Sequence, residues 1–586
     1  MPAITATETA PPLPEVPVSA WADAAAVSTW QQRPELFPVV CPIDVDLFES
    51  YLVTHPNRPL VRSVCNGLRV GFWPCANISD NAPSTCDSAQ RPLDEPKRAF
   101  LCRQRDIEIA ANRFSPSFGE HLLPGMYSPP ISVVPKPDGS DFRMITDHSA
   151  GKFAPNSWIA REDAHIKFDS LHDLGKRILQ LRAVHGPLAP LVLWKSDVSL
   201  AYRHIPMHPL WQMKQIVTID GRRHVDRCMV FGSRASARIW CTFFNLVLWI
   251  AVHVVGIPHL LAYMDDCFSV TASRVRLLYR PYQCDLPTDQ TLLLRLWDRL
   301  HIAHKARKQV AGLSLEIIGF HVCPASMTFS LPPEKRAELA LAIDTFLCSE
   351  DRRRSLREWQ RLLGWCNWAL NVSPLLRPAL QSSYAKIPGG GGPYTRIFIN
   401  KAVRADLTWF ARSFLASPTR RIYAGSLWAP SVADLTVFCD ASLTGLGFWV
   451  PRKAVAFAHT LSLAEGSSAP IFFLVALCVL SALEWVCSLS EPVRRVVIYT
   501  DSLNSVHLFG CLAGEPLYNP IVFRAVECLL HQDLDLRVLH IPGDRNTVAD
   551  LLSRGLLDLA CKYHPGLRIL PFSPSSDLTP SPSLRC

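Results

Sequence analysis

The chain has 586 residues, a length that exceeds what one hydrophobic core supports and that predicts several domains. Apolar residues make up 48% of the sequence, which excludes a mostly disordered protein. The 60 lysines and arginines outnumber the 51 aspartates and glutamates and give a formal net charge of +9. This mild basic excess is compatible with a nucleic-acid partner but does not identify one.

The cysteines and the apolar runs argue against a zinc-bound, secreted or membrane protein. The densest group among the 19 cysteines lacks the paired spacing of a zinc site: Cys65, Cys75, Cys86 and Cys102. The N-terminus has no basic start followed by an apolar run, so it does not resemble a secretory signal. The longest apolar run, Ile471 to Leu483, is too short to span a bilayer and is typical of a buried helix. We expect no membrane partner and an intracellular location, either cytoplasmic, nuclear or both.

The N-terminal part of the chain contains few regular patterns. Residues 1–40 are rich in proline and alanine and predict a flexible tail. Residues 41–120 mix short apolar segments with proline and cysteine, and we assign them only as an N-terminal extension. From Tyr127 to Ser149 the sequence predicts a strand, a turn and a second strand, with Pro137 and Gly139 suited to the turn.

Three acids lie within or at the end of apolar segments further along the chain. Asp197 ends an apolar strand in "LVLWKSDVSLAY", and Asp265 and Asp266 separate two short apolar strands in "HLLAYMDDCFSV", after a long helix pattern. Adjacent carboxylates repel each other unless a cation lies between them, and Mg²⁺ prefers carboxylate oxygens. If the strands are neighbours, the three acids could hold a metal pair for in-line phosphoryl displacement. A plain hairpin tip and a helix N-cap stay open as the alternative.

The C-terminal part of the chain repeats this pattern of acids at strand ends. After a predicted helix, "SLREWQRLLGWCNWALN", the glycine run 388–393 predicts a linker or a loop tip. A new α/β unit opens near residue 434, and in it Asp440 and Asp501 each end an apolar strand. His540 follows another strand, and Asp550 lies on a predicted helix. Acids that converge from different segments again suit a metal pair.

The order of these motifs resembles that of reverse transcriptases, and in particular of DIRS-like retrotransposon polyproteins, over roughly residues 45–555. "YMDD" is the sequence that many reverse transcriptases carry at the palm hairpin, and "SDVSLAY" resembles their other palm motif. "FGSRASARIW" resembles the segment over the templating base pair, although Ala237 stands where DIRS-like elements have proline. The resemblance implies an α+β and α/β multidomain fold: a right-hand polymerase with fingers, palm and thumb, followed by an RNase H-like α/β domain.

The resemblance also implies a role for each candidate residue. It assigns catalysis and the binding of two Mg²⁺ ions, or alternatively Mn²⁺, to Asp197, Asp265 and Asp266. It assigns nucleotide binding to six further residues: Lys136, Arg143, Tyr202, Phe231, Gly232 and Lys308. Tyr202 would lie under the nucleotide sugar and exclude the ribose 2′-OH. Lys308, with Lys305 and Arg307 as competitors, would protonate the pyrophosphate.

The second set of acids resembles the ribonuclease H domain that is fused to many reverse transcriptases. In that family Asp440, Asp501 and Asp550 would bind metal, and His540 would assist product release or proton transfer. The family also uses a glutamate on the helix between the first two acids, where this chain has Val475.

Neither nearby glutamate replaces the missing one. Glu484 lies about 2.5 turns further along the same helix and points to the opposite face. Glu465 precedes Pro470 and falls outside the predicted helix. We expect an RNase H-like fold whose nuclease activity is weak or absent, or a decayed copy in which Val475 is a neutral change.

The sequence therefore predicts an RNA-directed DNA polymerase of a retrotransposon, acting on an RNA template with a DNA primer, or on an RNA–DNA hybrid, and on deoxynucleoside triphosphates. The alternatives are a catalytically retired nucleic-acid-binding protein and a DNA-dependent polymerase. The oligomeric state is not indicated. The predicted domains are a flexible tail (1–40), an N-terminal extension (41–120), fingers and palm (121–345), thumb or connection helices (346–430), an RNase H-like domain (431–558) and a low-complexity tail (559–586).

Overall fold

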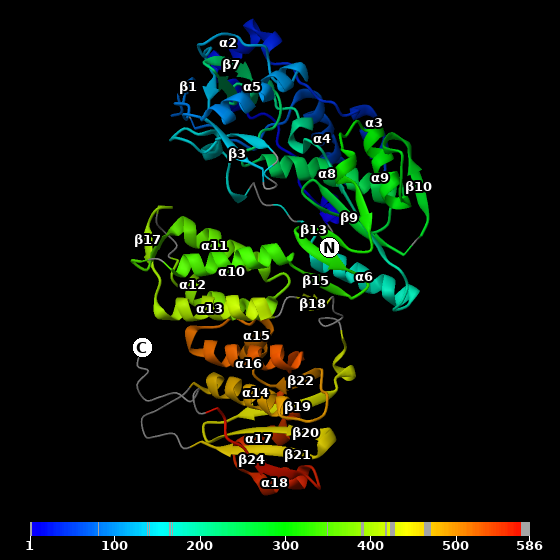
Figure 1. Ribbon diagram of the computed structural model, residues 1–586, viewed down its shortest axis with the longest axis vertical. Helices are drawn as coiled ribbons and strands as arrows, with labels where there is room; N and C mark the ends of the chain where they lie inside the picture. The colour runs from blue at the N-terminus through cyan, green and yellow to red at the C-terminus, as the bar shows by residue number, and fades with distance from the viewer. Residues whose placement is uncertain are drawn as a thin grey trace. The chain divides into compact units, whose positions relative to one another are not determined.

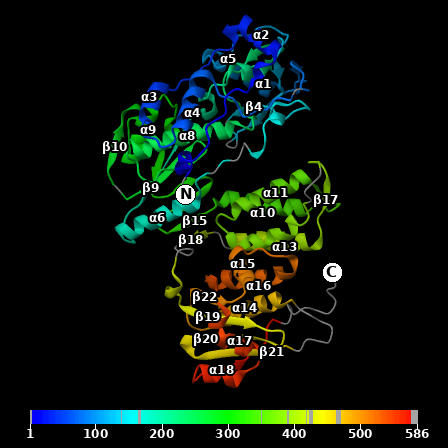
Figure 2. The same cartoon turned by 180° about the vertical axis from the view of Figure 1, so that it is seen from behind.

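The computed structural model divides the chain into two compact units, Met1–Ile318 and Gly319–Cys586, which are described separately (Figures 1 and 2). Both units mix helices and strands, which confirms the predicted α+β and α/β multidomain class. The structure describes residues 3–79, 81–136, 139, 141–162, 166, 168–272, 274–348, 350–387, 392–416, 419–421, 428–461 and 470–575. The predicted turn residue Pro137, Glu465, most of the glycine run and the end of the C-terminal tail lie outside the described residues.

Residues 3–40 are folded and contribute several side chains to the core of unit 1, so the prediction of a flexible tail is wrong. They form η1 (Ala3–Glu8), α1 (Val18–Trp21), α2 (Ala24–Gln32) and η2 (Pro34–Leu36). Leu13 and Phe37 are buried in the main hydrophobic cluster of the unit, and the buried Arg227 donates to the carbonyl oxygen of Leu36 at 3.1 Å. These anchors lie in short apolar segments bounded by prolines, so they carry no helical or strand periodicity that would predict burial.

The N-terminal extension is also an integral part of unit 1. It forms α3 (Val45–Tyr51), α4 (Arg58–Val70), β1 (Cys86–Asp87) and α5 (Glu95–Ala110). The side chains of Asp44, Asn57 and Asp94 cap the three helices by accepting a backbone N–H of the first turn. Apolar residues of α3 and α4, among them Phe48 and Leu60, lie in the main cluster.

A four-stranded antiparallel sheet positions the candidate site in unit 1. Its order is β12 (Val310–Gly312), β5 (Val192–Asp197), β9 (Asp266–Thr271) and β8 (Leu261–Tyr263). The two predicted strands around the acid pair are therefore present as β8 and β9. Helices α6 (Leu171–His185) and α9 (Thr288–Arg299) pack against this sheet.

Helix α8 (Ser236–His253) is the core helix of unit 1. By length and composition alone it could cross a membrane, but 67% of that segment is buried inside the structure. Trp240, Phe243 and Phe244 pack in the main cluster together with residues from the first 70 positions. The apolar character of α8 is thus accounted for by packing within the unit.

Small two-stranded sheets complete unit 1. The predicted strand, turn and strand are confirmed as β3 (Ile131–Pro135) paired with β4 (Phe142–Thr146). This hairpin forms a separate small core with α5 and with β6 (Ile216–Ile219), which pairs with β7 (Arg222–Val225). The remaining elements are β2 (Tyr127–Ser128), η3 (Pro155–Trp158), η5 (Ala201–His204), α7 (Pro209–Gln212), β10 (Arg276–Tyr279), η6 (Arg280–Tyr282), β11 (Cys284–Pro287), η7 (Ala306–Lys308) and β13 (Leu315–Ile317).

Unit 2 begins with a helical layer and short strands. The helices are α10 (Pro333–Leu347), α11 (Leu356–Ala369), η8 (Pro374–Leu380), α12 (Gln381–Tyr384) and α13 (Lys401–Ala416). The strands are β14 (Phe320–Cys323), β15 (Thr328–Ser330), β16 (Arg353–Ser355), β17 (Arg396–Phe398) and β18 (Thr419–Arg421). The predicted boundary between residues 345 and 346 falls inside α10 and is wrong, because α10 packs with α11 and α13 within this unit.

A six-stranded sheet forms the rest of unit 2 and is called the sheet domain below. Its order is β23 (Asp535–His540), β22 (Arg495–Thr500), β19 (Leu435–Ala441), β20 (Gly445–Val450), β21 (Val455–Thr460) and β24 (Arg568–Pro571). Strands β19, β20 and β21 are antiparallel, and the outer pairs β19–β22, β22–β23 and β21–β24 are parallel. The connecting elements are η9 (Pro430–Val432), η10 (Pro451–Lys453), η11 (Pro516–Tyr518) and η12 (Gly543–Arg545).

Helices cover both faces of this sheet (Figure 1). One face carries α14 (Ile471–Cys487), α15 (Leu503–Cys511) and α16 (Asn519–Gln532), and the other carries α17 (Thr547–Ser553) and α18 (Leu557–Tyr563). Consecutive residues of β21 show the two sides, because Phe457 packs with the first group and Ala456 with the second. The predicted tail boundary at residue 559 is wrong, since α18 and β24 extend the domain to Pro571.

Candidate active site

Three predicted acids meet at one end of the sheet in unit 1. Asp197 is the last residue of β5, and its cross-strand partner is Asp266, the first residue of β9. Asp265 lies in the two-residue turn between β8 and β9, and its carbonyl oxygen accepts the backbone N–H of Val198 at 3.1 Å. Strand pairing therefore brings together acids that are far apart in the sequence.

The turn that carries these acids has a constrained backbone. Met264 has φ of 58°, in the left-handed region that a two-residue hairpin loop requires but that a non-glycine residue seldom adopts. Its carbonyl oxygen accepts the indole N–H of Trp240, a fully buried residue of α8, at 3.1 Å. Such strain persists only where the surrounding structure fixes it, and it concentrates at functional sites.

The acids destabilise one another's charged forms. Burial, together with the charges of Asp197 and Asp265, raises the pKa of Asp266 to about 6 against the opposing effect of Lys195. Burial and the Asp197 charge also raise the pKa of Asp265 above its usual range. A cation bound between these carboxylates would stabilise their charged forms.

Lys308 supplies one positive charge to this cluster. Its Nζ atom lies 2.5 Å from Oδ1 of Asp197, an ion pair between η7 and the end of β5. Among the described residues, no three His, Cys, Asp or Glu side chains are arranged as ligands of one metal ion. The chemistry of the donors still fits a hard divalent cation, since all three are carboxylates at one strand end. A cation bound there would compete with Lys308 for Asp197.

Four of the predicted nucleotide-binding residues also lie together. The rings of Tyr202 and Phe231 are 4.9 Å apart, and the guanidinium of Arg143 lies 4.8 Å from the centre of the Phe231 ring. Gly232 follows with φ of 120°, and a Cβ atom there would lie 1.9 Å from the carbonyl oxygen of Thr146. Only glycine fits at this position, where the loop before α8 meets the end of β4.

Electrostatic interactions connect this stack to the acids. Arg143 opposes the rise in the pKa of Asp265, and Asp265 raises the pKa of the buried Tyr202 hydroxyl beyond the effect of burial. Lys136 pairs with Asp141 at 3.4 Å across the β3–β4 hairpin, with about a third of its side chain exposed. The strand register places Lys136 on the same face of the hairpin as Arg143, and its role in nucleotide binding stays a prediction.

Several supporting residues were missed by sequence reasoning. Asp169 accepts the backbone N–H of Ala262 in β8 at 2.9 Å, and Gln309 donates to the carbonyl oxygen of Asp197 at 3.1 Å. Lys195 is the one that a sequence signal could have found. It lies two residues before Asp197 on the same strand, and side chains at that spacing share one face of a sheet.

The acids of the sheet domain converge in a similar way. Asp440 lies near the end of β19, and Asp501 follows the adjacent parallel strand β22. Burial and Asp501 raise the pKa of Asp440 to about 6, and Asp550 on α17 adds to this effect. The Ser553 hydroxyl donates to Oδ2 of Asp440 at 2.9 Å, and Arg554 pairs with Asp550 at 2.7 Å. His540, the exposed last residue of β23, pairs in register with Thr500, the residue before Asp501.

The expected glutamate position is apolar and buried. Val475 on α14 is 5% exposed and belongs to the core of the sheet domain. Cys478, one turn further along α14, donates to the carbonyl oxygen of Gly447 in β20 at 3.3 Å. Glu484 pairs with Arg524 at 3.0 Å. Val475 thus packs toward the sheet, and Glu484 is paired away from the acids.

Comparisons with known proteins give a fold-level likeness only. No protein-family model and no curated protein matches the chain. The chain is similar to three structures of foamy viral protease-reverse transcriptase, and the likeness covers 86% of this chain in each case. The dRH form with double-stranded DNA has a TM-score of 0.42 and 16% identity, with 83% of that chain covered. The complex with RNA/DNA hybrid has a TM-score of 0.43, 15% identity and 64% of that chain covered, and the complex with double-stranded DNA has a TM-score of 0.41, 16% identity and 99% of that chain covered. The likeness is partial and concerns the fold alone.

Proposed function

We propose that this chain is an RNA-directed DNA polymerase of a retrotransposon that acts inside the cell. The observation that carries the proposal is the meeting of Asp197, Asp265 and Asp266 beside the stacked Arg143, Phe231 and Tyr202 side chains. A carboxylate cluster next to a fixed guanidinium and an aromatic floor suits nucleotidyl transfer, in which positioning and charge neutralisation lower the barrier.

The three acids would hold two Mg²⁺ ions, or Mn²⁺, which supply Lewis-acid activation of the primer hydroxyl and neutralise the triphosphate. Arg143 would bind the triphosphate of the incoming deoxynucleotide, because its guanidinium is already held against the Phe231 ring. Tyr202 would lie under the sugar, where its ring leaves no room for a 2′-OH. Lys308, once released from Asp197, would donate a proton to the departing pyrophosphate.

The nucleic-acid partners would be an RNA template with a DNA primer, or the RNA–DNA hybrid formed during synthesis. Affinity for these partners would come mainly from phosphate contacts and would fall as salt rises. The hybrid would be recognised by shape rather than by sequence.

The sheet domain would keep an RNase H-like arrangement with little nuclease activity. Three acids converge there, but the buried Val475 cannot ligate a metal ion. A second candidate function is a nucleic-acid-binding protein that has lost catalysis. It draws support from the absence of the expected glutamate at Val475 and from the ion pair between Lys308 and Asp197.

Primer extension separates the two candidates. The purified full chain is given a DNA primer on an RNA template, deoxynucleoside triphosphates and Mg²⁺, in parallel with Asp265→Asn. Extension by the wild type and not by the variant supports the polymerase, whereas equal inactivity with retained template binding supports the binding protein. A matched DNA template identifies a DNA-dependent polymerase if only that template is copied.

A further inference from the structure

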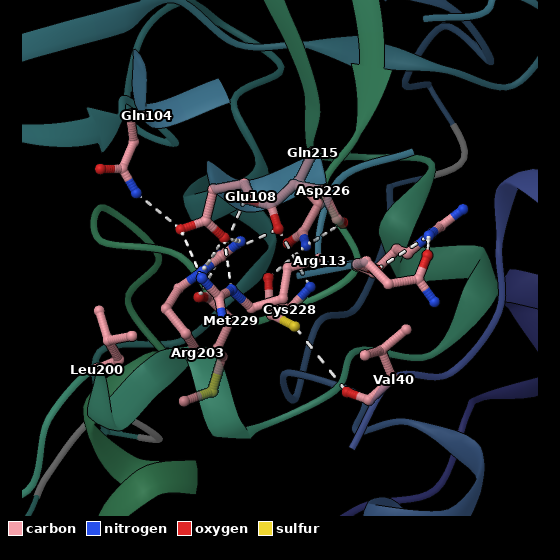
Figure 3. Close-up of polar contacts among 12 residues, drawn as sticks. Val40, Gln104, Glu108, Arg113, Leu200, Arg203, Gln215, Asp226, Cys228 and Met229 are labelled. Atoms are coloured by element: carbon pink, nitrogen blue, oxygen red, sulfur yellow. Dashed lines mark hydrogen bonds and ion pairs between the residues drawn. The ribbon is translucent and has the colours of Figure 1, made fainter. Parts of the chain in front are cut away.

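A network of four charged side chains is centred on Arg203 in the interior of unit 1 (Figure 3). Arg203, which follows Tyr202 in η5, donates to Oε2 of Glu108 at 2.7 Å and to Oδ2 of Asp226 at 3.0 Å. It also donates to the carbonyl oxygen of Met229 at 3.1 Å. Arg203 is 8%, Glu108 2% and Asp226 0% exposed, so these charges are almost fully removed from water.

Hydrogen bonds and ion pairs satisfy the polar atoms of the network, although burial raises the pKa of Asp226 to about 7. Arg113 donates to both oxygens of Glu108, at 2.7 and 3.2 Å, so two arginines face two carboxylates. Burial opposes ionisation of Glu108, but Arg203 and Arg113 outweigh it and hold its pKa at about 2. The backbone N–H of Cys228 donates to Oδ1 of Asp226 at 3.1 Å. A buried ion network that is fully hydrogen-bonded holds its members in one geometry, since any displacement leaves a charge unpaired.

The same short helix is fixed on a second side. The backbone N–H of Ala303 donates to Nε2 of His204 at 3.0 Å, and Nδ1 of His204 lies 3.1 Å from the carbonyl oxygen of Leu200. Leu200 has φ of 59°, a left-handed conformation that needs support from its surroundings. Tyr202 is therefore followed directly by two anchored residues, Arg203 and His204, and its ring lies against Phe231.

We infer that Arg203 is a positioning residue that fixes Tyr202, and thereby sets how strongly the site selects deoxyribose over ribose; this inference rests on the proposed function. The network joins η5 to helix α5 through Glu108 and to the segment after β7 through Asp226. The residue that follows Tyr202 is therefore bonded to two other parts of unit 1. A guanidinium is suited to this task, because its rigid fork of donors binds two carboxylates and a carbonyl at once. Lysine keeps the charge but lacks the fork.

The test compares the incorporation of a deoxynucleotide with that of the matching ribonucleotide on one primed template. The measured quantity is the ratio of the two kcat/KM values for the wild type, Arg203→Lys and Glu108→Gln. Tyr202→Val gives the loss of selectivity expected when the ring is removed. Arg227→Lys is the matched control, because Arg227 is also a buried arginine, bonded to Leu36 and Asn112 but not to η5.

Selectivity should fall at least about tenfold in Arg203→Lys and Glu108→Gln, a change of about 1.4 kcal/mol, and should be unchanged in Arg227→Lys. Circular dichroism establishes folding, and Glu108→Gln decides the question if Arg203→Lys does not fold. Wild-type selectivity in a folded network variant, or an equal loss in the control, overturns the inference alone. If the wild type incorporates neither nucleotide on an RNA or a DNA template, the proposed function fails and the inference fails with it.

Discussion

The two units of this protein each bring three carboxylates together, but the two clusters differ in their counter-charges. In unit 1, Asp197 and Asp266 face each other across paired strands, and Lys308 lies 2.5 Å from Asp197. In the sheet domain, Asp440 accepts the Ser553 hydroxyl, and Asp550 is paired with Arg554. Both clusters are buried enough that the pKa of one acid, Asp266 or Asp440, is raised to about 6.

Under the proposed function, an acid cluster and a metal site are separate properties of a fold. Strand ends, and helix α17 in the case of Asp550, place the carboxylates, so each cluster depends on the fold and not on a bound metal. Metal binding depends on the complete set of ligands, and the proposal puts the missing ligand of the sheet domain at one helix position. Val475 fills that position in the sheet domain with a side chain that has no ligand atom and that packs well in an apolar core. We therefore expect polymerase activity in unit 1 and little nuclease activity in the sheet domain.

The largest predicted contrast comes from neutralising one strand-end acid in each cluster. Asp197→Asn should lower primer extension at least about a thousandfold, because a lost metal ligand removes transition-state charge stabilisation worth several kcal/mol. Asp501→Asn should change primer extension less than about twofold and should leave hybrid cleavage at background. Both activities are measured on the same preparations, with template affinity as the control for folding. Robust hybrid cleavage by the wild type that Asp501→Asn abolishes would contradict the contrast.

The second prediction concerns stability and its pH dependence. Asp440 has a folded pKa of about 6 against 3.8 for an ordinary aspartate, so the folded state binds its proton more tightly. Its contribution to stability is full below about pH 3.8 and is lost as pH rises through about 6. Asp440→Asn should therefore raise the free energy of unfolding by up to about 3 kcal/mol at pH 7.5 and leave it unchanged at pH 4. Urea denaturation at the two pH values measures this.

Added Mg²⁺ then distinguishes the clusters. Without metal, Asp266→Asn should also stabilise the protein at pH 7.5, since the Asp266 pKa is raised in the same direction. With Mg²⁺ present, the wild type gains binding free energy that Asp266→Asn loses, so the variant becomes the less stable protein. Asp440→Asn should keep its advantage in Mg²⁺. A reversal for Asp440→Asn as well would show that the sheet domain binds metal.

Sequence patterns predicted the parts of this molecule that depend on local periodicity. Asp265 and Asp266 interrupt two short apolar strands, and a hairpin follows from that pattern. The anchors Leu13 and Phe37 show no regular spacing, so residues 1–40 were predicted to be a tail although these two anchors are buried. Sequence patterns do not predict long-range contacts for a similar reason. The pairing of Lys308 with Asp197 joins residues 111 positions apart, and no local spacing indicates it.

The same limit applied to residues whose role is to support others. In the sequence, Arg203 is indistinguishable from a charged surface residue that follows Tyr202. Only the fold brings Glu108 and Asp226 into contact with it. The role of Lys136 stays a prediction. Lys136 pairs with Asp141 near the turn, and the strand register places it on the same face of the hairpin as Arg143. A turn fixes the backbone and not the direction of a long side chain.

The third prediction restores the missing ligand in the sheet domain. Val475→Glu should raise cleavage of an RNA–DNA hybrid in Mn²⁺ at least about tenfold above the wild type, equivalent to about 1.4 kcal/mol of barrier. The buried charge should lower the melting temperature without metal, and metal should recover part of the loss. Val475→Gln is the matched control, because glutamine has the same size without the charge. Cleavage by the glutamine variant, or none by a folded glutamate variant, would show that Val475 is not the defect.

The smallest predicted effect is the competition between Lys308 and metal for Asp197. The Lys308 side chain is 39% exposed, and exposed ion pairs contribute at most about 1 kcal/mol. Lys308→Met should therefore lower the Mg²⁺ concentration for half-maximal primer extension by up to about fivefold, and it should lower kcat because the proposed proton donor is gone. Lys305→Met is the control, since Lys305 lies three residues away on the same segment and the described contacts of Asp197 involve Lys308 and not Lys305. An unchanged Mg²⁺ requirement in Lys308→Met would mean that the ion pair is already open in solution. The two clusters would then differ in Val475 and not in the cation that faces their acids.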